Sequence, residues 1–259
     1  MAAAGERDLV RHVSLLYSPP LGEVTTDHEW VTFTTGLPSR HHNGVLRSPL
    51  ILDEATVERR LKEFERAGVP LMWWFFTERG GMDARTHDYL LANGLELESN
   101  RPGMGLPLDA LAQRDLPPGS VMERVSDVST FEIWRGIVNR AFGQSPAEDG
   151  SSEAFRRYGF DISAPFQHYV CRSGESFVAA VTLTPVGSFV GVSNVSTLPD
   201  ARRRGFGSGL LAASLSDTAS RGARVAVLSA DDSGAAVYRG LGFKEVSRHL
   251  TYVKRQGRA

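Results

Sequence analysis

Residues 195–215 have the sequence Val195-Ser-Thr-Leu-Pro-Asp-Ala-Arg-Arg-Arg-Gly-Phe-Gly-Ser-Gly-Leu-Leu-Ala-Ala-Ser-Leu215. The β-branched start predicts a strand, the glycines predict a turn, and Phe206, Leu210 and Leu211 begin an apolar pattern with helical spacing. Three arginines precede the glycines, where the backbone can turn its N–H groups inward without Cβ hindrance. The N-terminus of the following helix adds partial positive charge, so this stretch predicts a phosphate or pyrophosphate site.

Two common phosphate loops fit these residues poorly. A Walker A loop requires Gly-Lys-Ser/Thr, and no lysine stands in the stretch. A Rossmann turn requires Gly-x-Gly-x-x-Gly/Ala, but Leu210 occupies the last position and the arginines stand before the glycines. Asp231 and Asp232, after the next expected strand, are a weak point in favour of the Rossmann alternative.

Arg202-Arg-Arg-Gly-Phe-Gly207 resembles the Arg/Gln-x-x-Gly-x-Gly/Ala turn that binds acetyl-CoA in the GNAT superfamily of N-acetyltransferases. Downstream, Tyr238-Arg-Gly-Leu-Gly-Phe243 resembles the Tyr-x-x-Leu-Gly-Phe landmark of the same family. The expected order of strands and helices also follows that family over residues 118–256. The resemblance implies an acetyl-CoA-dependent N-acetyltransferase that moves the acetyl group to a primary amine, in a ternary complex.

The resemblance also implies roles for individual residues. The pyrophosphate would lie on the backbone N–H groups of the turn, and the pantetheine arm would pair with the strand before it. The residues expected to bind the coenzyme are Val195, Ser196, Thr197, Arg202, Arg203, Arg204, Gly205, Phe206, Gly207, Ser208 and Asp231. Tyr238 would be the catalytic acid, because its unperturbed pKa of about 10 is near that of a thiol, about 8.5.

The base that removes the amine's proton is not identified by the sequence. Many family members carry a glutamate on the strand before the turn, whereas residues 188–198 contain no carboxylate. Glu153, Asp161 and His168 remain alternatives that would act through water.

The predicted fold is α/β (α+β): a central mixed, mainly antiparallel sheet flanked by helices, occurring in tandem. Residues 101–120 are rich in proline and glycine and predict irregular structure and a linker. We therefore expect a degenerate GNAT-like domain at residues 1–115 and a catalytic domain at residues 116–259. Residues 89–95 resemble the Tyr-x-x-Leu-Gly-Phe landmark in weakened form, but the helix expected after Asp53 has no glycine turn before it.

Further local patterns make specific structural predictions. Residues 8–17 fit a short helix or strand. A short strand is expected at residues 95–97, Ser129-x-x-Glu132 suggests a capping box, and a last pair of strands is expected near residues 245–246 and 250–253.

Composition limits the class of protein. The chain has 259 residues, of which 41% are hydrophobic, and its formal charge is −1. That charge predicts neither a nucleic-acid partner nor a membrane partner. A single cysteine, Cys171, allows no internal disulfide and no multi-cysteine metal site, so we expect no metal. No export signal or membrane span is recognisable, which favours a cytoplasmic protein.

The acceptor is expected to be a small molecule. If the cleft lies between the domains, the residues that could face the acceptor are Asn43, Trp134 and Phe142. A non-catalytic acyl-CoA-binding or interaction module is the alternative from another class, and a nucleic-acid binder is a remote third. The sequence leaves a homodimer open.

Overall fold

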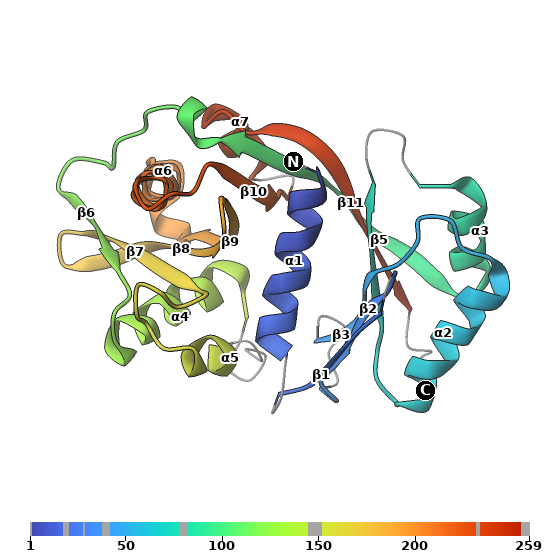
Figure 1. Ribbon diagram of the computed structural model, residues 1–259. Helices are drawn as coiled ribbons and strands as arrows, with labels where there is room; N and C mark the ends of the chain where they lie inside the picture. Colours follow the sequence, from blue (N-terminus) through green and yellow to red (C-terminus); the bar gives the residue numbers. More distant parts are fainter. Residues whose placement is uncertain are drawn as a thin grey trace. The chain divides into compact units, whose positions relative to one another are not determined.

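The computed structural model describes most of the chain (Figure 1). The described residues are 2–17, 21–27, 29–37, 42–77, 82–144, 152–231 and 234–254. The chain forms two compact units. The C-terminal unit comprises Met104–Lys244 with Ala3–Asp8, and the N-terminal unit comprises Leu9–Gly103 with Glu245–Ala259 and Ala2.

The boundaries between these units lie inside one helix, α1 (Ala2–Tyr17), and two strands, β5 (Leu95–Pro107) and β11 (Lys244–Lys254). Each unit therefore contains part of both strands, and the last strand of the chain belongs mainly to the N-terminal unit. The predicted domains, residues 1–115 and 116–259, are each one continuous segment, whereas each compact unit consists of more than one segment. The predicted domain boundary stays a prediction.

The C-terminal unit contains the stretch with the arginines and glycines. Its complete elements are β6 (Ser120–Arg124), α4 (Val128–Phe142), α5 (Ser152–Arg157), β7 (Gln167–Ser173), β8 (Ser176–Val186), β9 (Phe189–Thr197), α6 (Phe206–Ser220), β10 (Val225–Ser229) and α7 (Ala235–Gly240). The strands follow the order β10-β9-β8-β7-β6, with the end of β5 beside β10. Strands β6 to β9 pair antiparallel, whereas β9 and β10 pair parallel.

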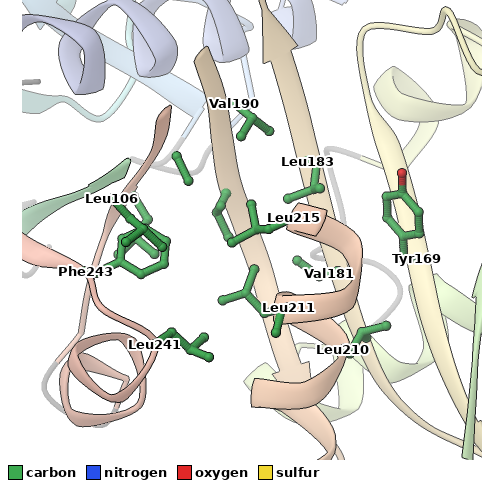
Figure 2. Close-up of a cluster of buried hydrophobic side chains, with 14 of the residues drawn as sticks. Leu106, Tyr169, Val181, Leu183, Val190, Leu210, Leu211, Leu215, Leu241 and Phe243 are labelled. Carbon is green, nitrogen blue, oxygen red and sulfur yellow. The ribbon is translucent and has the colours of Figure 1, made fainter. Parts of the chain in front are cut away.

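Helices α6 and α4 cover opposite faces of this sheet (Figure 1). Leu211 and Leu215 of α6 pack with Val181 of β8 in one buried cluster, which Figure 2 shows. On β7, the ring of His168 contacts Trp134 of α4, whereas the next residue, Tyr169, bonds to α6. Successive side chains of a strand point to opposite faces, so these contacts assign one helix to each face.

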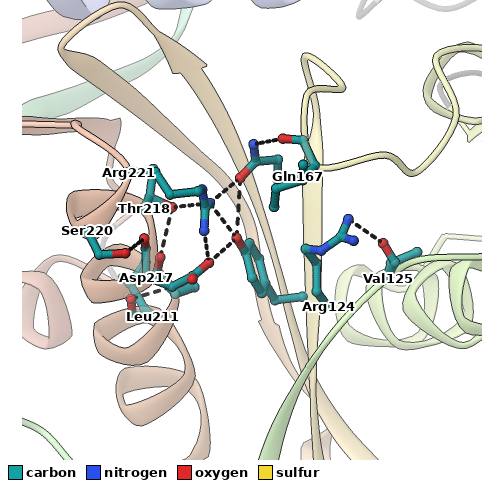
Figure 3. Close-up of polar contacts among 11 residues, drawn as sticks. Arg124, Val125, Gln167, Leu211, Asp217, Thr218, Ser220 and Arg221 are labelled. Carbon is teal, nitrogen blue, oxygen red and sulfur yellow. Dashed lines mark hydrogen bonds and ion pairs between the residues drawn. The ribbon is translucent and has the colours of Figure 1, made fainter.

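A polar cluster fixes the C-terminal end of α6 to β7 (Figure 3). The Tyr169 hydroxyl donates to Asp217 Oδ2 at 2.8 Å, and Arg221 forms an ion pair with the same carboxylate. Arg221 also donates to Gln167 Oε1 at 2.6 Å. Burial raises the pKa of Asp217, but its bonds with Arg221 and Tyr169 outweigh this and hold the pKa below its usual value. The helix is therefore anchored at the end opposite the glycine turn.

The N-terminal unit has a hydrophobic core of its own. Its other elements are the part of α1 (Ala2–Tyr17) that begins at Leu9, β1 (Glu23–Thr26), β2 (Val31–Thr34), β3 (Asn43–Arg47), α2 (Glu54–Arg66), β4 (Met72–Thr77) and α3 (Ala84–Ala92). The strand order is β1-β2-β3-β4-β11-β5. Trp73 and Phe75 of β4 and Tyr252 of β11 are buried together with Leu61 of α2. The mixed, mainly antiparallel sheets flanked by helices confirm the predicted fold class.

Two expectations for strands were wrong. Residues 101–107 are not irregular but continue β5, although they contain two prolines and two glycines. At Gly103 a Cβ would lie 2.1 Å from Ser247 Oγ, so the glycine is required by close packing rather than by a turn. The expected pair of strands after residue 244 is one continuous strand, β11, because residues 248–253 all pair with β4.

The structure corrects the position of the predicted capping box and shows which of two alternatives residues 8–17 adopt. The capping box lies at Asp127 and Thr130 rather than at Ser129 and Glu132, because the Asp127 carboxylate accepts from the Thr130 backbone N–H at 2.8 Å. The segment expected to be a short helix or strand is part of helix α1. Cys171 is buried, and burial raises the pKa of its thiol to about 11.

Candidate functional site

The glycine turn leads directly into α6 and leaves its first backbone donors without a side-chain cap. Gly205 precedes the helix with φ of 87°, a conformation that favours glycine. No side chain caps this end, and the first turn carries no acidic residue. The N–H groups at this end and the positive end of the helix dipole are therefore suited to an anion.

Two other glycines of the turn are required by close approach. A Cβ at Gly207 would lie 2.7 Å from Thr197 Oγ1, and a Cβ at Gly209 would lie 2.8 Å from the carbonyl oxygen of Asp115. These distances are too short for a side chain, so larger residues at either position would displace the turn or its neighbours.

The three arginines of the stretch have different surroundings. Arg202 donates from Nε to the Thr197 carbonyl at 3.1 Å and from its guanidinium to the Ala141 carbonyl at 3.0 Å. It thereby braces the turn against the end of α4. Arg204 lies over the ring of Phe206, 5.0 Å from its centroid. Arg203 is exposed and has a positive φ of 60°.

A cavity of about 680 Å³ opens in front of this turn. It is lined by all of the predicted coenzyme-binding residues except Arg204, together with Tyr238. Its walls also include Ala141, Phe142, Ala201, Gly234 and Val237, most of which the sequence analysis did not assign to a site.

The cavity forms where strands β9 and β10 separate. Their parallel register covers only Phe189–Gly191 of β9, although β9 continues to Thr197. Towards β8 the register shifts, because Ala180 pairs with Ser196 and Thr182 pairs with Ser193. Two residues, Asn194 and Val195, thus oppose one residue of β8, which is a β-bulge. The β-bulge and the separation of β9 from β10 together leave residues 195–197 in the cavity wall.

Tyr238 lies on α7 at the opposite wall. Gly234 allows its ring to approach the backbone, since a Cβ there would be 2.7 Å from Tyr238 Cε2. Asp231 Oδ1 accepts from the Gly234 backbone N–H at 2.6 Å and fixes the start of α7. Burial, and secondly the charge of Asp231, raise the pKa of Tyr238 to about 12. The Tyr238 hydroxyl makes no hydrogen bond with the described residues, so its proton is available to a ligand.

A second cavity of about 260 Å³ adjoins the first, because Phe142 lines both. Trp134 lies in its wall with Asn194, so the structure brings together two of the three predicted acceptor residues, Trp134 and Phe142. Asn43 lies in the N-terminal unit, where its side chain accepts from the Thr35 backbone N–H at 2.9 Å and donates to the Leu37 carbonyl at 2.8 Å. Those bonds give its amide a structural role.

None of the three candidate bases lines either cavity within the described residues. Asp161 accepts from the Ser163 backbone N–H at 2.9 Å, which is the main cause of its lowered pKa. Glu153 is exposed and lies 3.9 Å from Arg156. His168 is buried, with Nδ1 2.9 Å from Thr182 Oγ1.

Asn194 is the residue of the site that sequence reasoning missed most clearly. It has a positive φ of 51° and stands in the bulge between the two cavities. Asparagine tolerates this conformation better than most residues, so an asparagine among the β-branched residues of the strand was a signal for the bulge.

The described residues contain neither a group of three or more metal-ligating side chains nor a helix long and apolar enough to cross a membrane.

Residues 124–246 match the family model described as an acetyltransferase (GNAT) domain. Among solved structures, the chain is similar to a GCN5-related N-acetyltransferase from Kribbella flavida, with a TM-score of 0.72, 19% identity and coverage of 98% of this chain and 96% of the other. It is also similar to a tandem GNAT protein from the clavulanic acid biosynthesis pathway, with a TM-score of 0.64, 13% identity and coverage of 97% and 88%. No curated protein matches the sequence. Residues 124–246 therefore form a GNAT acetyltransferase domain, and the chain shares its fold with a tandem GNAT protein.

Proposed function

We propose that the chain is an acetyl-CoA-dependent N-acetyltransferase of the cytoplasm that acetylates a primary amine on a small molecule. The observation that carries this proposal is the uncapped N-terminus of α6, which opens into the 680 Å³ cavity opposite Tyr238. The family supports acetyl transfer in general, and the glycine turn supports a pyrophosphate-bearing coenzyme.

The residues of the turn and of β9 would hold the coenzyme. The N–H groups at the start of α6 would bind the pyrophosphate, with Arg203 as the exposed cation beside them. Arg202 would act indirectly, since its guanidinium already holds the Thr197 and Ala141 carbonyls. The wall formed by residues 195–197 would position the arm that carries the acetyl group.

Acetyl-CoA would supply an activated acetyl thioester, whose C–S bond breaks as the amine nitrogen forms its bond to the acetyl carbon. The Val195 backbone N–H would donate to the thioester oxygen, which gains negative charge. Tyr238 would donate a hydrogen bond to the departing sulfur, and the proton that the amine nitrogen loses would pass through water to the thiolate, so that coenzyme A leaves as the thiol. With a pKa of about 12, the phenol stays protonated throughout the physiological range, so it acts as a hydrogen-bond donor more readily than as a full proton donor to a thiol of pKa about 8.5.

The experiment that tests the proposal is calorimetric titration with acetyl-CoA, followed by measurement of free thiol released in the presence of a panel of primary amines. We expect saturable binding and amine-dependent thiol release. Absence of binding would overturn the proposal as a whole.

A non-catalytic acyl-CoA-binding module is the second candidate. It is favoured by the positions of Glu153, Asp161 and His168, none of which lines the described cavity walls. Binding of acetyl-CoA without thiol release for every amine of the panel would support this candidate against the enzyme.

A further inference from the structure

Residues 111–119, here called the strap, connect the short 3-10 helix Leu108–Ala110 with β6 and belong to the C-terminal unit. The sequence predicted a linker in this part of the chain. At the end of the strap, the Ser120 backbone N–H donates to the Pro117 carbonyl at 3.0 Å. The third residue of this turn is Gly119, with φ of 76°, as a type II turn favours. The strap therefore ends in a defined turn instead of a flexible connection.

The strap begins against the end of α7. The Ala112 backbone N–H donates to the Leu241 carbonyl at 3.1 Å. Directly before the strap, the Ala110 carbonyl oxygen would lie 3.0 Å from a Cβ at Gly242. Leu241 and Gly242 follow α7, whose Tyr238 lines the larger cavity. The start of the strap thus supports the cavity wall that α7 forms.

The strap then packs on the first turns of α6. A Cβ at Gly209 would lie 2.8 Å from the Asp115 carbonyl oxygen and 3.0 Å from Leu116 Cα, which are backbone atoms of the strap. The strap can lie this close only because residue 209 is glycine. Gly209 directly follows Ser208, which lines the larger cavity. Figure 1 shows this segment, in green, passing α7 and then α6 on its way to β6.

The middle of the strap is held by backbone contacts more than by burial of its side chains. Gln113, Arg114 and Asp115 are exposed. Leu111 and Leu116, on either side of them, are partly buried against the core of the C-terminal unit. Segments with few buried side chains open at a lower free-energy cost than the core does. The strap can therefore separate from α6 and α7 while the rest of the unit stays folded.

We propose that the strap is a positioning segment of the coenzyme site: it holds the start of α6 and the end of α7 at the separation that acetyl-CoA requires, and bound acetyl-CoA in turn holds the strap closed on both helices. Residues of both helices line the larger cavity, so a ligand that contacts both binds best when their separation is already set. A ligand that prefers the closed state must also increase its population. This inference rests on the proposed function, because it identifies what positions the coenzyme site of that reaction.

Gly209→Ala tests the contact from the side of α6. The Cβ would displace the Asp115 carbonyl, so we expect the Kd and the KM for acetyl-CoA to rise about tenfold, with a smaller change in kcat. The melting temperature should change little, because alanine favours the helix more than glycine does and offsets the lost contact. Gly136→Ala in α4, where a Cβ has open space, should bind like native protein. Equal affinity in the two variants would overturn the role of the contact.

Gly119→Val tests the contact from the side of the strap and leaves α6 untouched. Valine is disfavoured at positive φ, so it strains the turn that ends the strap although a Cβ there has open space. We expect acetyl-CoA affinity to fall about threefold or more. Gly174→Val, in the turn between β7 and β8, also has positive φ and open space and should keep native affinity. Equal affinity in these two variants would show that the strap does not position the site.

Hydrogen exchange of the Ala112 amide measures the link to the coenzyme directly. This amide bonds to Leu241 while the strap is closed, so at acetyl-CoA 100 times above Kd its exchange should slow by about 100-fold. The Arg221 amide at the other end of α6, which donates to the Thr218 carbonyl at 3.1 Å, should keep its rate. Unchanged exchange at Ala112 in protein that calorimetry shows to be saturated overturns the strap alone. Absence of acetyl-CoA binding to native protein overturns the proposed function, and this inference with it.

Discussion

Helix α6 of the C-terminal unit and helix α2 of the N-terminal unit both precede a buried strand, but their N-termini are completed in opposite ways. Helix α6 starts after Gly205 and has no side-chain cap. Helix α2 starts after Asp53, whose carboxylate accepts from the Thr56 backbone N–H at 2.7 Å. That bond is the main cause of the lowered pKa of Asp53. The N-terminus of α6 therefore has no side-chain acceptor, whereas that of α2 has a carboxylate acceptor from its own chain.

This difference gives a physical meaning to the expectation of a degenerate N-terminal domain. Glu54 adds a second acidic residue in the first turn of α2, whereas the first turn of α6 contains none. A phosphate at α2 would meet like charge and occupied donors. A helix that has no coenzyme to bind can therefore be stabilised by an ordinary cap.

The largest effect is expected for Gly207→Glu, which would make the start of α6 both obstructed and acidic. The side chain would collide with Thr197 Oγ1, and its charge would repel a pyrophosphate. We expect acetyl-CoA affinity to fall roughly 1000-fold or more in calorimetry. Gly136→Glu on the exposed side of α4, where a Cβ has open space, should bind normally. Equal acetyl-CoA affinity in both variants would show that the coenzyme does not bind at this turn.

A large effect on stability is expected from His249 in the N-terminal unit. Burial, and secondly Arg248, lower its pKa to about 4. Below pH 6.5 the unfolded chain binds a proton that the folded chain refuses, so the free energy of unfolding should fall as pH drops and level off below pH 4. The loss is roughly 3 kcal/mol. Urea unfolding of native protein and His249→Gln at several pH values measures it, and identical slopes would contradict the assignment.

Tyr238→Phe should affect turnover without affecting the turn. We expect kcat to fall about 100-fold, the low end for loss of an acid catalyst, with acetyl-CoA affinity unchanged. Because the pKa of Tyr238 is raised to about 12, the native pH profile should show no loss of its proton below pH 10. The control is Tyr169→Phe, which loses its bond to Asp217 and should lower stability rather than kcat. Unchanged turnover in Tyr238→Phe would exclude the acid role.

Ser208→Asp would make α6 resemble α2 by placing a carboxylate in its first turn. Acidic residues stabilise helix N-termini, so the melting temperature should stay the same or rise slightly. We expect acetyl-CoA affinity to fall about tenfold, since the carboxylate competes with the pyrophosphate. Ser208→Asn is the uncharged control. A variant that binds as tightly as native protein would show that charge at this end does not distinguish the two helices.

The smallest effect is expected for Asp53→Ala, which removes the cap of α2. Thermal unfolding should occur roughly 2–4 °C lower, because the backbone donors of the first turn lose their partner. Acetyl-CoA affinity should not change, since the coenzyme is assigned to the other unit. A change in acetyl-CoA affinity would show that α2 contributes to coenzyme binding, which would contradict the contrast drawn between α2 and α6.

The sequence was sufficient to predict those elements whose local pattern of residues is compatible with one backbone structure. The glycine turn, the helix after Asp53 and the Tyr238 helix are set by short-range chemistry, and the structure brings the predicted turn residues into one cavity. The sequence was insufficient where the local structure depends on a residue far away in the chain. Gly103 looked like part of a linker, but its reason lies at Ser247 and His249, far along the chain. The β-bulge at Asn194 has a local signal in the asparagine itself, but the residues that it opposes depend on the register with β8, which the local sequence does not specify.

The N-terminal unit is built from two segments far apart in the chain, which has a consequence for biosynthesis. Strand β4 of the N-terminal unit pairs with β11, which includes the last described residues of the chain. At roughly 5–20 residues per second, a ribosome needs about 7–28 s to make the residues between Gly103 and Glu245. During this interval β4 presents an open edge, a site at which nascent chains aggregate. Completion of the N-terminal sheet therefore waits until β11 has been synthesised, and a chain that ends at residue 244 would leave that edge unpaired.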